Sequence, residues 1–293
     1  MIGRAAGALL LLIFAAAPLR SSDAAALETI VSFPSLDGDL TGGSPTTLTA
    51  LMLTPEGDGP FPAIVLAHGC DGLRRPDGKT LSSTYIWWAR RFAAEGYIAL
   101  LVDSFQPRGR RQVCVNEPDK VTITPTRERA RDAQAARAYL AASPIIAKGR
   151  IGLMGWSNGG STVLGAISEG APGRPVQGNF AAAVAFYPGC FLQFRDTTWK
   201  PAVPTLILIG EADDWTPARF CQNLTDRLSE NSIPISIHVY PEAHHAFDAP
   251  NLALRVRQGV NTRSGTATIG TNHAARDDAI LRTLSFFNTA LKR

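Results

Sequence analysis

The sequence predicts an α/β fold: a doubly wound, mostly parallel sheet of about eight strands with helices on both faces. Short apolar runs, typical of strands buried on both faces, alternate with segments of helical periodicity. Parallel strands need long crossovers, and the intervening helices supply them. The 293 residues are 45% hydrophobic and 18% charged, which is the composition of a globular protein rather than of a disordered or membrane chain.

The first two strands are expected to pair as a hairpin, because residues 28–35 and 46–55 are β-branched segments separated by turn-rich sequence. Residues 61–68 are continuously apolar, as expected of a strand covered on both faces. A helix at 82–95 ends at Gly96, and after a buried strand at 97–102 an Ala- and Arg-rich helix at 126–142 ends before Pro144.

The second half of the chain continues the alternation. A strand at 150–155 leads into a helix at 158–167, and apolar runs at 181–187 and 204–209 are the next strands. The final elements are an amphipathic helix at 217–230, a strand at 234–240 and a closing helix at 274–291. Residues 251–272, rich in Gly, Thr and Asn, are expected to form a long mobile loop that could close over a site as a lid.

The N-terminal segment predicts an export signal. Arg4 precedes an apolar run over residues 5–18, which is shorter than the about 20 residues that span a bilayer. Residues 24–26, Ala-Ala-Ala, then provide the small side chains that a signal-peptide cleavage site requires. We expect a signal peptide over residues 1–26 and an exported domain over 27–293, periplasmic or secreted, with no membrane span; a buried N-terminal helix is the alternative.

The net charge and the spacing of charged and metal-ligating residues indicate which kinds of partner the protein has. Twenty-nine basic and 25 acidic side chains give a formal net charge of +4, and no run of five or more like charges occurs. This pattern does not favour a nucleic-acid partner. No cluster with metal-ligand spacing is visible, so we expect neither a metal nor an organic cofactor.

A serine follows the strand at 150–155 in the segment Gly-Trp-Ser-Asn-Gly, residues 155–159, and the next helix begins there. This strand–turn–helix context is the one that a nucleophile elbow requires, with glycines where the sharp turn has no room for side chains. Ser157 would then project above the sheet, with the amide of Asn158 beside it to stabilise an oxyanion. The alternative is a helix-capping serine in a Gly-rich turn.

A serine nucleophile needs a base, and the base needs an orienting acid. Two later strand ends supply candidates in the order that this fold uses, acid before histidine. The segment after 204–209 contains Asp213 and Asp214, and the segment after 234–240 contains His244 and His245. Spacing alone leaves both choices open and favours Asp213 and His245.

Three segments together resemble the dienelactone hydrolase family, whose members have the α/β-hydrolase fold: Gly-Trp-Ser-Asn-Gly-Gly at 155–160, Gly-Glu-Ala-Asp-Asp-Trp-Thr-Pro at 210–217 and Tyr-Pro-Glu-Ala-His-His-Ala-Phe at 240–247. The resemblance runs from residue 46 to the C-terminus. It implies that the acid, three residues after Gly and four before Pro, is Asp213. It also implies that the base, which immediately precedes x-Phe, is His245.

The chain departs from the family pattern in ways that bear on substrate. Dienelactone hydrolases themselves use a cysteine nucleophile and carry a glutamate after the histidine that ends the third strand. Here the corresponding residues are Ser157 and Gly69. The resemblance therefore implies a general carboxylesterase more than a dienelactone hydrolase in the strict sense.

The turn after the strand at 61–68 is where this fold contributes a second oxyanion amide, and by position that amide belongs to Cys70. Four cysteines allow three disulfide connectivities. An oxidising compartment favours disulfides, and pairing Cys70 with Cys114 and Cys190 with Cys221 would join neighbouring strand ends around the site.

Four residues near the predicted site are candidates for substrate binding. Trp156, Tyr187 and Trp215 could line a pocket or pack in the core. Arg108 follows a strand at the same edge of the sheet, close to where the resembled family has an arginine that binds a substrate carboxylate, and an exposed loop arginine is the alternative.

These features predict a serine hydrolase that cleaves a small-molecule ester or lactone through an acyl-enzyme, with Ser157, His245 and Asp213 as its triad. A peptidase or amidase could use the same triad. A non-catalytic exported binding protein on a hydrolase scaffold is the other alternative, and the presence of every triad member disfavours it.

Overall fold

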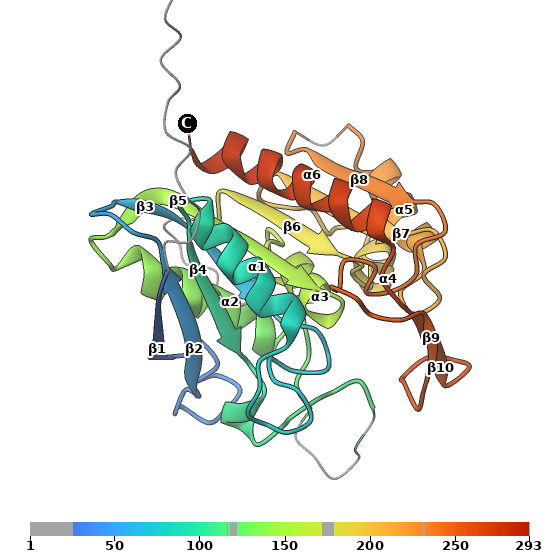
Figure 1. Cartoon of the computed structure of the whole chain (residues 1–293), viewed down its shortest axis with the longest axis horizontal. Helices are drawn as coiled ribbons and strands as arrows, with labels where there is room; N and C mark the ends of the chain where they lie inside the picture. The colour runs from blue at the N-terminus through green and yellow to red at the C-terminus, as the bar shows by residue number, and fades with distance from the viewer. Residues whose placement is uncertain (1–25, 116, 118–121, 172–178, 231, 293) are drawn as a thin grey trace, which may run out of the picture.

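Eight strands form one twisted sheet in the order β1-β2-β4-β3-β5-β6-β7-β8 (Figure 1). The computed structural model describes residues 26–115, 117, 122–171, 179–230 and 232–292. β1 and β2 pair antiparallel, β2 pairs antiparallel with β4, and the other neighbours are parallel. The strands are β1 (Leu27–Pro34), β2 (Thr47–Thr54), β3 (Phe61–Ala67), β4 (Ile98–Asp103), β5 (Ile146–Trp156), β6 (Ala182–Phe186), β7 (Thr205–Gly210) and β8 (Ile235–Tyr240).

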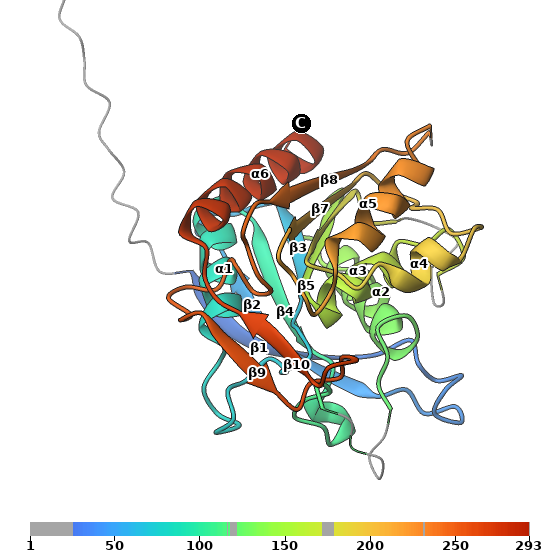
Figure 2. The same cartoon turned by 90° about the vertical axis from the view of Figure 1, so that its right-hand side faces the viewer.

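The central strands are buried because helices cover both faces of the sheet. Every residue of β4, β6 and β7 is buried, as their continuous apolar sequences predict. Figures 1 and 2 show α1 (Ser83–Ala94) and α6 (His273–Leu291) on one face, and α2 (Glu128–Ala141), α3 (Asn158–Ala166) and α5 (Ala218–Arg227) on the other. Phe92 of α1 and Phe287 of α6, both fully buried, meet edge-to-face. The predicted doubly wound α/β fold is confirmed.

The predicted signal peptide and the predicted lack of a membrane span concern the N-terminus and the helices. The signal peptide predicted over residues 1–26 lies, apart from Ala26, outside the described residues. Within the described segments, none of the helices combines the length and the apolar character that a membrane span needs.

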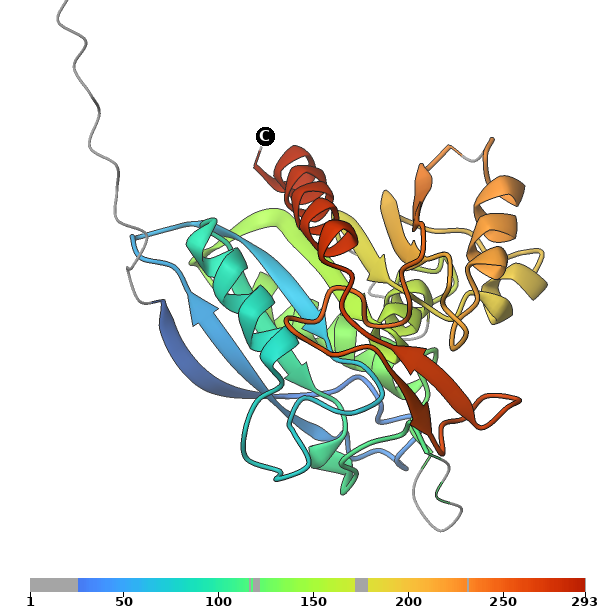
Figure 3. The same cartoon turned by 45° about the vertical axis from the view of Figure 1, so that its right-hand side comes forward.

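The prediction of an irregular loop at 251–272 is wrong. This segment contains an antiparallel pair, β9 (Arg255–Gln258) and β10 (Thr266–Ile269), which projects beside the body of the domain in Figure 3. Glycines with positive φ, Gly259 and Gly265, flank the connection between the strands. The alternation in Thr-Ala-Thr-Ile, which buries Ala267 and Ile269, was the strand signal within an otherwise polar composition. Two short helices, η1 (Gln106–Arg108) and α4 (Phe191–Arg195), were not expected either.

Arg108 belongs to a buried ion cluster rather than to a substrate site. Its guanidinium donates to Asp37 at 2.7 Å and to both carboxylate oxygens of Asp132 at 2.8 Å, and it also donates to the Ser104 carbonyl. Only 7% of the side chain is exposed. Burial opposes the charge, but the bonds to Asp132 and Asp37 outweigh it and raise the pKa of Arg108. The cluster ties the β1–β2 connection and α2 to the end of β4.

Replacing Arg108 by methionine should destabilise the fold by about 3–5 kcal/mol, because two buried carboxylates lose the cation that compensates them. Chemical denaturation followed by circular dichroism measures the change. The control is Arg90→Met, which removes an exposed ion pair with Glu28 and should cost less than about 1 kcal/mol. Equal effects of the two substitutions would contradict a structural role for the Arg108 cluster.

Candidate active site

Ser157 occupies a sharp turn between β5 and α3. Its backbone has φ 53° and ψ −117°, a strained conformation for a residue with a side chain. The flanking glycines allow the turn to pack: a Cβ at Gly159 would lie 2.0 Å from the carbonyl oxygen of Ala67, and one at Gly155 would lie 2.3 Å from the carbonyl oxygen of Gly159. The close packing holds the serine above the carboxyl end of the sheet.

Asp213 and His245 come from the turns after β7 and β8 and meet Ser157 at this edge. His245 Nε2 lies 2.9 Å from Ser157 Oγ, and His245 Nδ1 lies 2.8 Å from Asp213 Oδ2. Asp213 Oδ1 accepts the backbone amides of Trp215 and Thr216, which fixes the carboxylate in place. Both Asp213 and His245 are buried. The three side chains therefore form a continuous chain of hydrogen bonds from carboxylate to hydroxyl.

The alternative acid and base candidates point elsewhere. Asp214 is exposed and binds Thr268 of β10 through both carboxylate oxygens. His244 Nδ1 lies 3.0 Å from the carbonyl oxygen of Ala212, on a neighbouring turn. The structure thus places Asp213 and His245, not Asp214 and His244, beside Ser157.

The amides of Asn158 and Cys70 lie where the sequence predicts oxyanion donors. Asn158 is the first residue of α3, and Cys70 lies in the turn after β3 and lines the same cavity as Ser157. Across the described part of the chain, neither amide donates to a protein acceptor. Neither amide therefore has a protein acceptor that would compete with a bound anionic oxygen.

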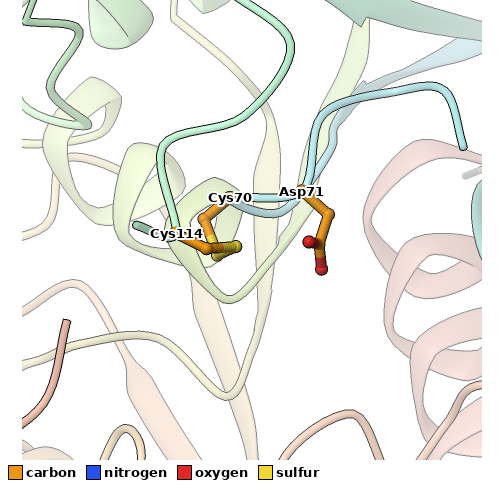
Figure 4. Close-up of side chains that lie close together, drawn as sticks. All are labelled: Cys70, Asp71 and Cys114. Atoms are coloured by element: carbon orange, nitrogen blue, oxygen red, sulfur yellow. A yellow bond between two sulfur atoms is a disulfide. The ribbon is translucent and has the colours of Figure 1, made fainter. Parts of the chain in front are cut away.

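The two predicted disulfides are present at this edge of the sheet. Cys70 is bonded to Cys114, and Cys190 is bonded to Cys221. This is the connectivity that the order of the strand ends favours. Asp71 lies next to the first disulfide (Figure 4), but the bonded sulfurs are not thiolates, so these three residues are not a metal-ligand set.

A cavity of about 860 Å³ opens above Ser157 and His245. Tyr187 and Trp215 line it, and their rings lie against the His245 imidazole, with centroids 4.6 and 4.8 Å away. Trp156 also lines it but is otherwise buried. The structure thus brings three of the four predicted substrate-binding residues to the cavity, while Arg108 lies in the ion cluster.

The rim of the cavity is positively charged. Of the residues that line it, all of them in the described segments, Asp71 is the one acid, and its carboxylate forms a bidentate pair with Arg257 at 2.6 Å. Arginines come from the turn after β3, the segment after η1 and the β9–β10 hairpin: Arg74, Arg75, Arg111, Arg255 and Arg257. Arginines of this kind recognise carboxylates and phosphates through paired N–H donors.

Asp248 is a buried carboxylate that sequence reasoning missed. It accepts hydrogen bonds from the indoles of Trp88 and Trp156 at 2.9 Å and from the hydroxyl of Tyr187 at 2.6 Å. Burial raises the pKa of this carboxyl, although the three donors oppose the shift. The bonds join the histidine turn to the residue before Ser157 and to the ring that lies against His245. No local sequence pattern indicates this role, because the three donors come from distant segments.

The sheet order, the helices on both faces and a serine on the sharp turn after β5 define the class: the protein is an α/β hydrolase. The family model of the dienelactone hydrolase family matches residues 48–291. The chain therefore belongs to the dienelactone hydrolase family.

Three individual proteins to which the chain is similar have low sequence identity to it. A protein of Bradyrhizobium sp assigned as a 2-oxo-3-(5-oxofuran-2-ylidene)propanoate lactonase is 24% identical over 210 residues, which cover 68% of this chain and 78% of that protein. The crystal structure of a protein from Klebsiella pneumoniae subsp. pneumoniae assigned as a dienelactone hydrolase has 20% identity and a TM-score of 0.56, over 89% of this chain and 98% of that one. The dienelactone hydrolase-like promiscuous phosphotriesterase P91, from metagenomic libraries, has 18% identity and a TM-score of 0.61, over 90% and 98% of the two chains. At these identities the structures show the shared fold.

Separate substitutions of the two aspartates and of the two histidines should show which aspartate is the acid and which histidine is the base. If Asp213 and His245 are the acid and base of a serine hydrolase, Asp213→Asn and His245→Ala should each lower kcat for an activated ester by about 10³–10⁴-fold, because the serine would lose its oriented base. Asp214→Asn and His244→Ala should leave kcat within about threefold of the unsubstituted protein, since these side chains do not contact Ser157. Steady-state kinetics checks both, and a large loss in the second pair would contradict the assignment.

Proposed function

We propose that this protein is a serine hydrolase that cleaves carboxylic esters or lactones through an acyl-enzyme. The observation that carries the proposal is the hydrogen-bonded chain from Asp213 through His245 to Ser157, which ends beside two unoccupied backbone amides. A serine hydroxyl at its ordinary pKa is a weak nucleophile, and this arrangement supplies the base and the oxyanion donors that it needs.

The reaction follows from these positions. Ser157 Oγ attacks the substrate carbonyl while His245 Nε2 takes the hydroxyl proton, and the carbonyl electron pair moves onto the oxygen. The amides of Cys70 and Asn158 donate to that oxyanion. The intermediate collapses and the alcohol leaves with the proton from His245. Water then attacks the acyl-enzyme with the same histidine as base. The second intermediate breaks its bond to Ser157 Oγ, which takes the proton back from His245, and the carboxylic acid is released. In both halves Asp213 orients the imidazole and stabilises its charged form.

The charge of the cavity indicates a substrate that bears an anionic group. Among the described residues, five arginines and one carboxylate line the cavity, and that carboxylate is already paired with Arg257. The name of the Bradyrhizobium relative describes a lactone that carries a carboxylate, which is the same chemistry. The substrate class proposed is therefore an ester or lactone whose acyl or alcohol part carries a carboxylate or a similar anion.

The proposal also includes the compartment in which the protein acts. The protein acts after export, since two disulfides are typical of an oxidising compartment and the first 26 residues have the pattern of a signal peptide.

A peptidase or amidase would use the same residues, and a panel of p-nitroanilides measured beside the matching p-nitrophenyl esters separates the activities.

The purified protein should react covalently with a fluorophosphonate probe, because the activated Ser157 attacks the phosphorus and retains the adduct. Mass spectrometry should place the adduct on Ser157, and Ser157→Ala should abolish both labelling and turnover of p-nitrophenyl acetate. An unlabelled and inactive natural sequence would exclude the hydrolase and leave the non-catalytic binding protein.

Arg255→Gln should raise KM for an anionic ester by about three- to tenfold, because a hydrogen bond to a charged group contributes about 1.5–3 kcal/mol when shielded and less at an exposed rim. KM for a neutral ester of similar size should not change. The matched control is Arg263→Gln, which removes the same charge from the same hairpin outside the cavity. Equal KM changes for neutral and anionic esters would refute charge recognition.

A further inference from the structure

Arg129 is a buried arginine that contacts the turns next to the proposed site. It lies in the first turn of α2, and 1% of its surface is exposed. Its guanidinium lies over the face of Phe105, 4.9 Å from the ring centroid. Charged side chains are rarely buried to this extent without a partner of opposite charge, so its role needs a physical reason.

The guanidinium bridges the two segments that carry the predicted oxyanion donors. Arg129 Nη2 donates to the carbonyl of His68 at 2.7 Å, and Nη1 donates to the side-chain oxygen of Asn158. His68 lies two residues before Cys70, and Asn158 is itself the other donor. One rigid, planar group is therefore bonded to both of these segments.

Successive peptide groups carry this restraint to the Cys70 amide. The N–H and C=O of a trans peptide point in opposite directions. Arg129 holds the carbonyl of His68, and the amide of Gly69, in the same peptide, donates to the hydroxyl of Tyr85 on the other side at 2.8 Å.

The next peptide is held in the same manner. The Ser104 amide donates to His68 Nε2 at 3.3 Å, so the proton of this neutral ring is on Nδ1, which donates to the Gly69 carbonyl at 2.8 Å. With the Gly69 carbonyl fixed on one side, the N–H of Cys70 is directed to the other. Burial and the nearby Arg129 lower the pKa of His68, which keeps the ring neutral.

The positive charge of Arg129 is not neutralised by a direct ion pair. Among the described residues, no carboxylate oxygen lies within 4.0 Å of its guanidinium. Asp132 and Asp103 act on it only through space, and Asp132 is bonded to Arg108. Burial lowers the pKa of Arg129 to about 10, so it stays charged at neutral pH. Its field is weakly screened in this buried position.

We propose that Arg129 is a positioning residue of the oxyanion hole, which aligns the amides of Cys70 and Asn158 and adds a buried positive charge beneath them. The inference rests on the proposed hydrolase function. When the bond from Ser157 Oγ to the substrate carbon forms, the carbonyl electron pair moves to the oxygen, and the negative charge develops at the amides whose segments Arg129 holds. The stabilisation grows with that charge, so it acts on the transition state more than on the bound substrate.

The test compares Arg129→Met, which removes the charge and both bonds, with Arg129→Lys, which keeps the charge. Arg129→Met should lower kcat for a p-nitrophenyl ester by about 10²-fold or more, as the loss of an oxyanion donor does, with KM within about threefold. Its affinity for an alkyl boronic acid, a mimic of the tetrahedral adduct, should fall in parallel with kcat. Arg129→Lys should recover at least about tenfold of the lost kcat.

Arg137→Met is the matched control, because it removes another buried arginine of α2 that does not contact the site. It should lose stability without losing kcat, with thermal unfolding measured for every variant. Arg129→Met with kcat within threefold of the natural sequence, or Arg129→Lys as impaired as Arg129→Met, would overturn the inference. An inactive natural sequence would overturn the proposed function instead, so the two failures are distinguishable.

Discussion

The turn at Ser157 leaves no space for a side chain at Gly159, and the arrangement of the site depends on that close packing. A Cβ there would lie 2.0 Å from the Ala67 carbonyl oxygen and 2.5 Å from that of His68. α3 can therefore begin directly against the end of β3. This contact brings the turn that carries Asn158 against the turn that carries Cys70, two segments that are distant in the sequence. The strained backbone of Ser157 persists because the surrounding contacts fix it.

The parallel sheet supplies the remaining geometry. β5, β7 and β8 point the same way, so the turns that follow them meet at one edge, where open α/β sheets carry their sites. Fine positioning comes from buried hydrogen bonds rather than from the strands. Asp213 is held by two amides of its own turn, and Asp248 holds Tyr187, whose ring lies against His245. Each of these carboxylates accepts hydrogen bonds from several donors, which lowers the free-energy cost of burying it.

The sequence predicts most of the sheet because continuous apolar runs and turn residues are local signals. It also predicts Ser157, Asp213 and His245 as neighbours, because parallel strand ends share an edge and the spacing within each turn is short-range information. It does not predict that Arg108 would be withdrawn from the cavity, since that depends on Asp37 and Asp132, which approach only when the fold is complete. The hairpin at 255–269 was not predicted because its polar composition resembles that of a loop. It is also held by a long-range contact, between Thr268 and Asp214.

Arg108 and Arg129 differ in how their buried charge is compensated, and the difference separates structural from electrostatic roles. Arg108 is bonded to two carboxylates, which raise its pKa and more than offset its positive charge, so this cluster presents no net positive charge to a substrate. Arg129 binds a carbonyl, an amide oxygen and an aromatic face, none of which carries a formal charge, and burial lowers its pKa. A fold gains little stability from a buried cation without a counter-ion, because its desolvation is not repaid by an ion pair. In the proposed reaction, the oxyanion of the tetrahedral intermediate would supply the counter-ion that Arg129 lacks in the resting protein.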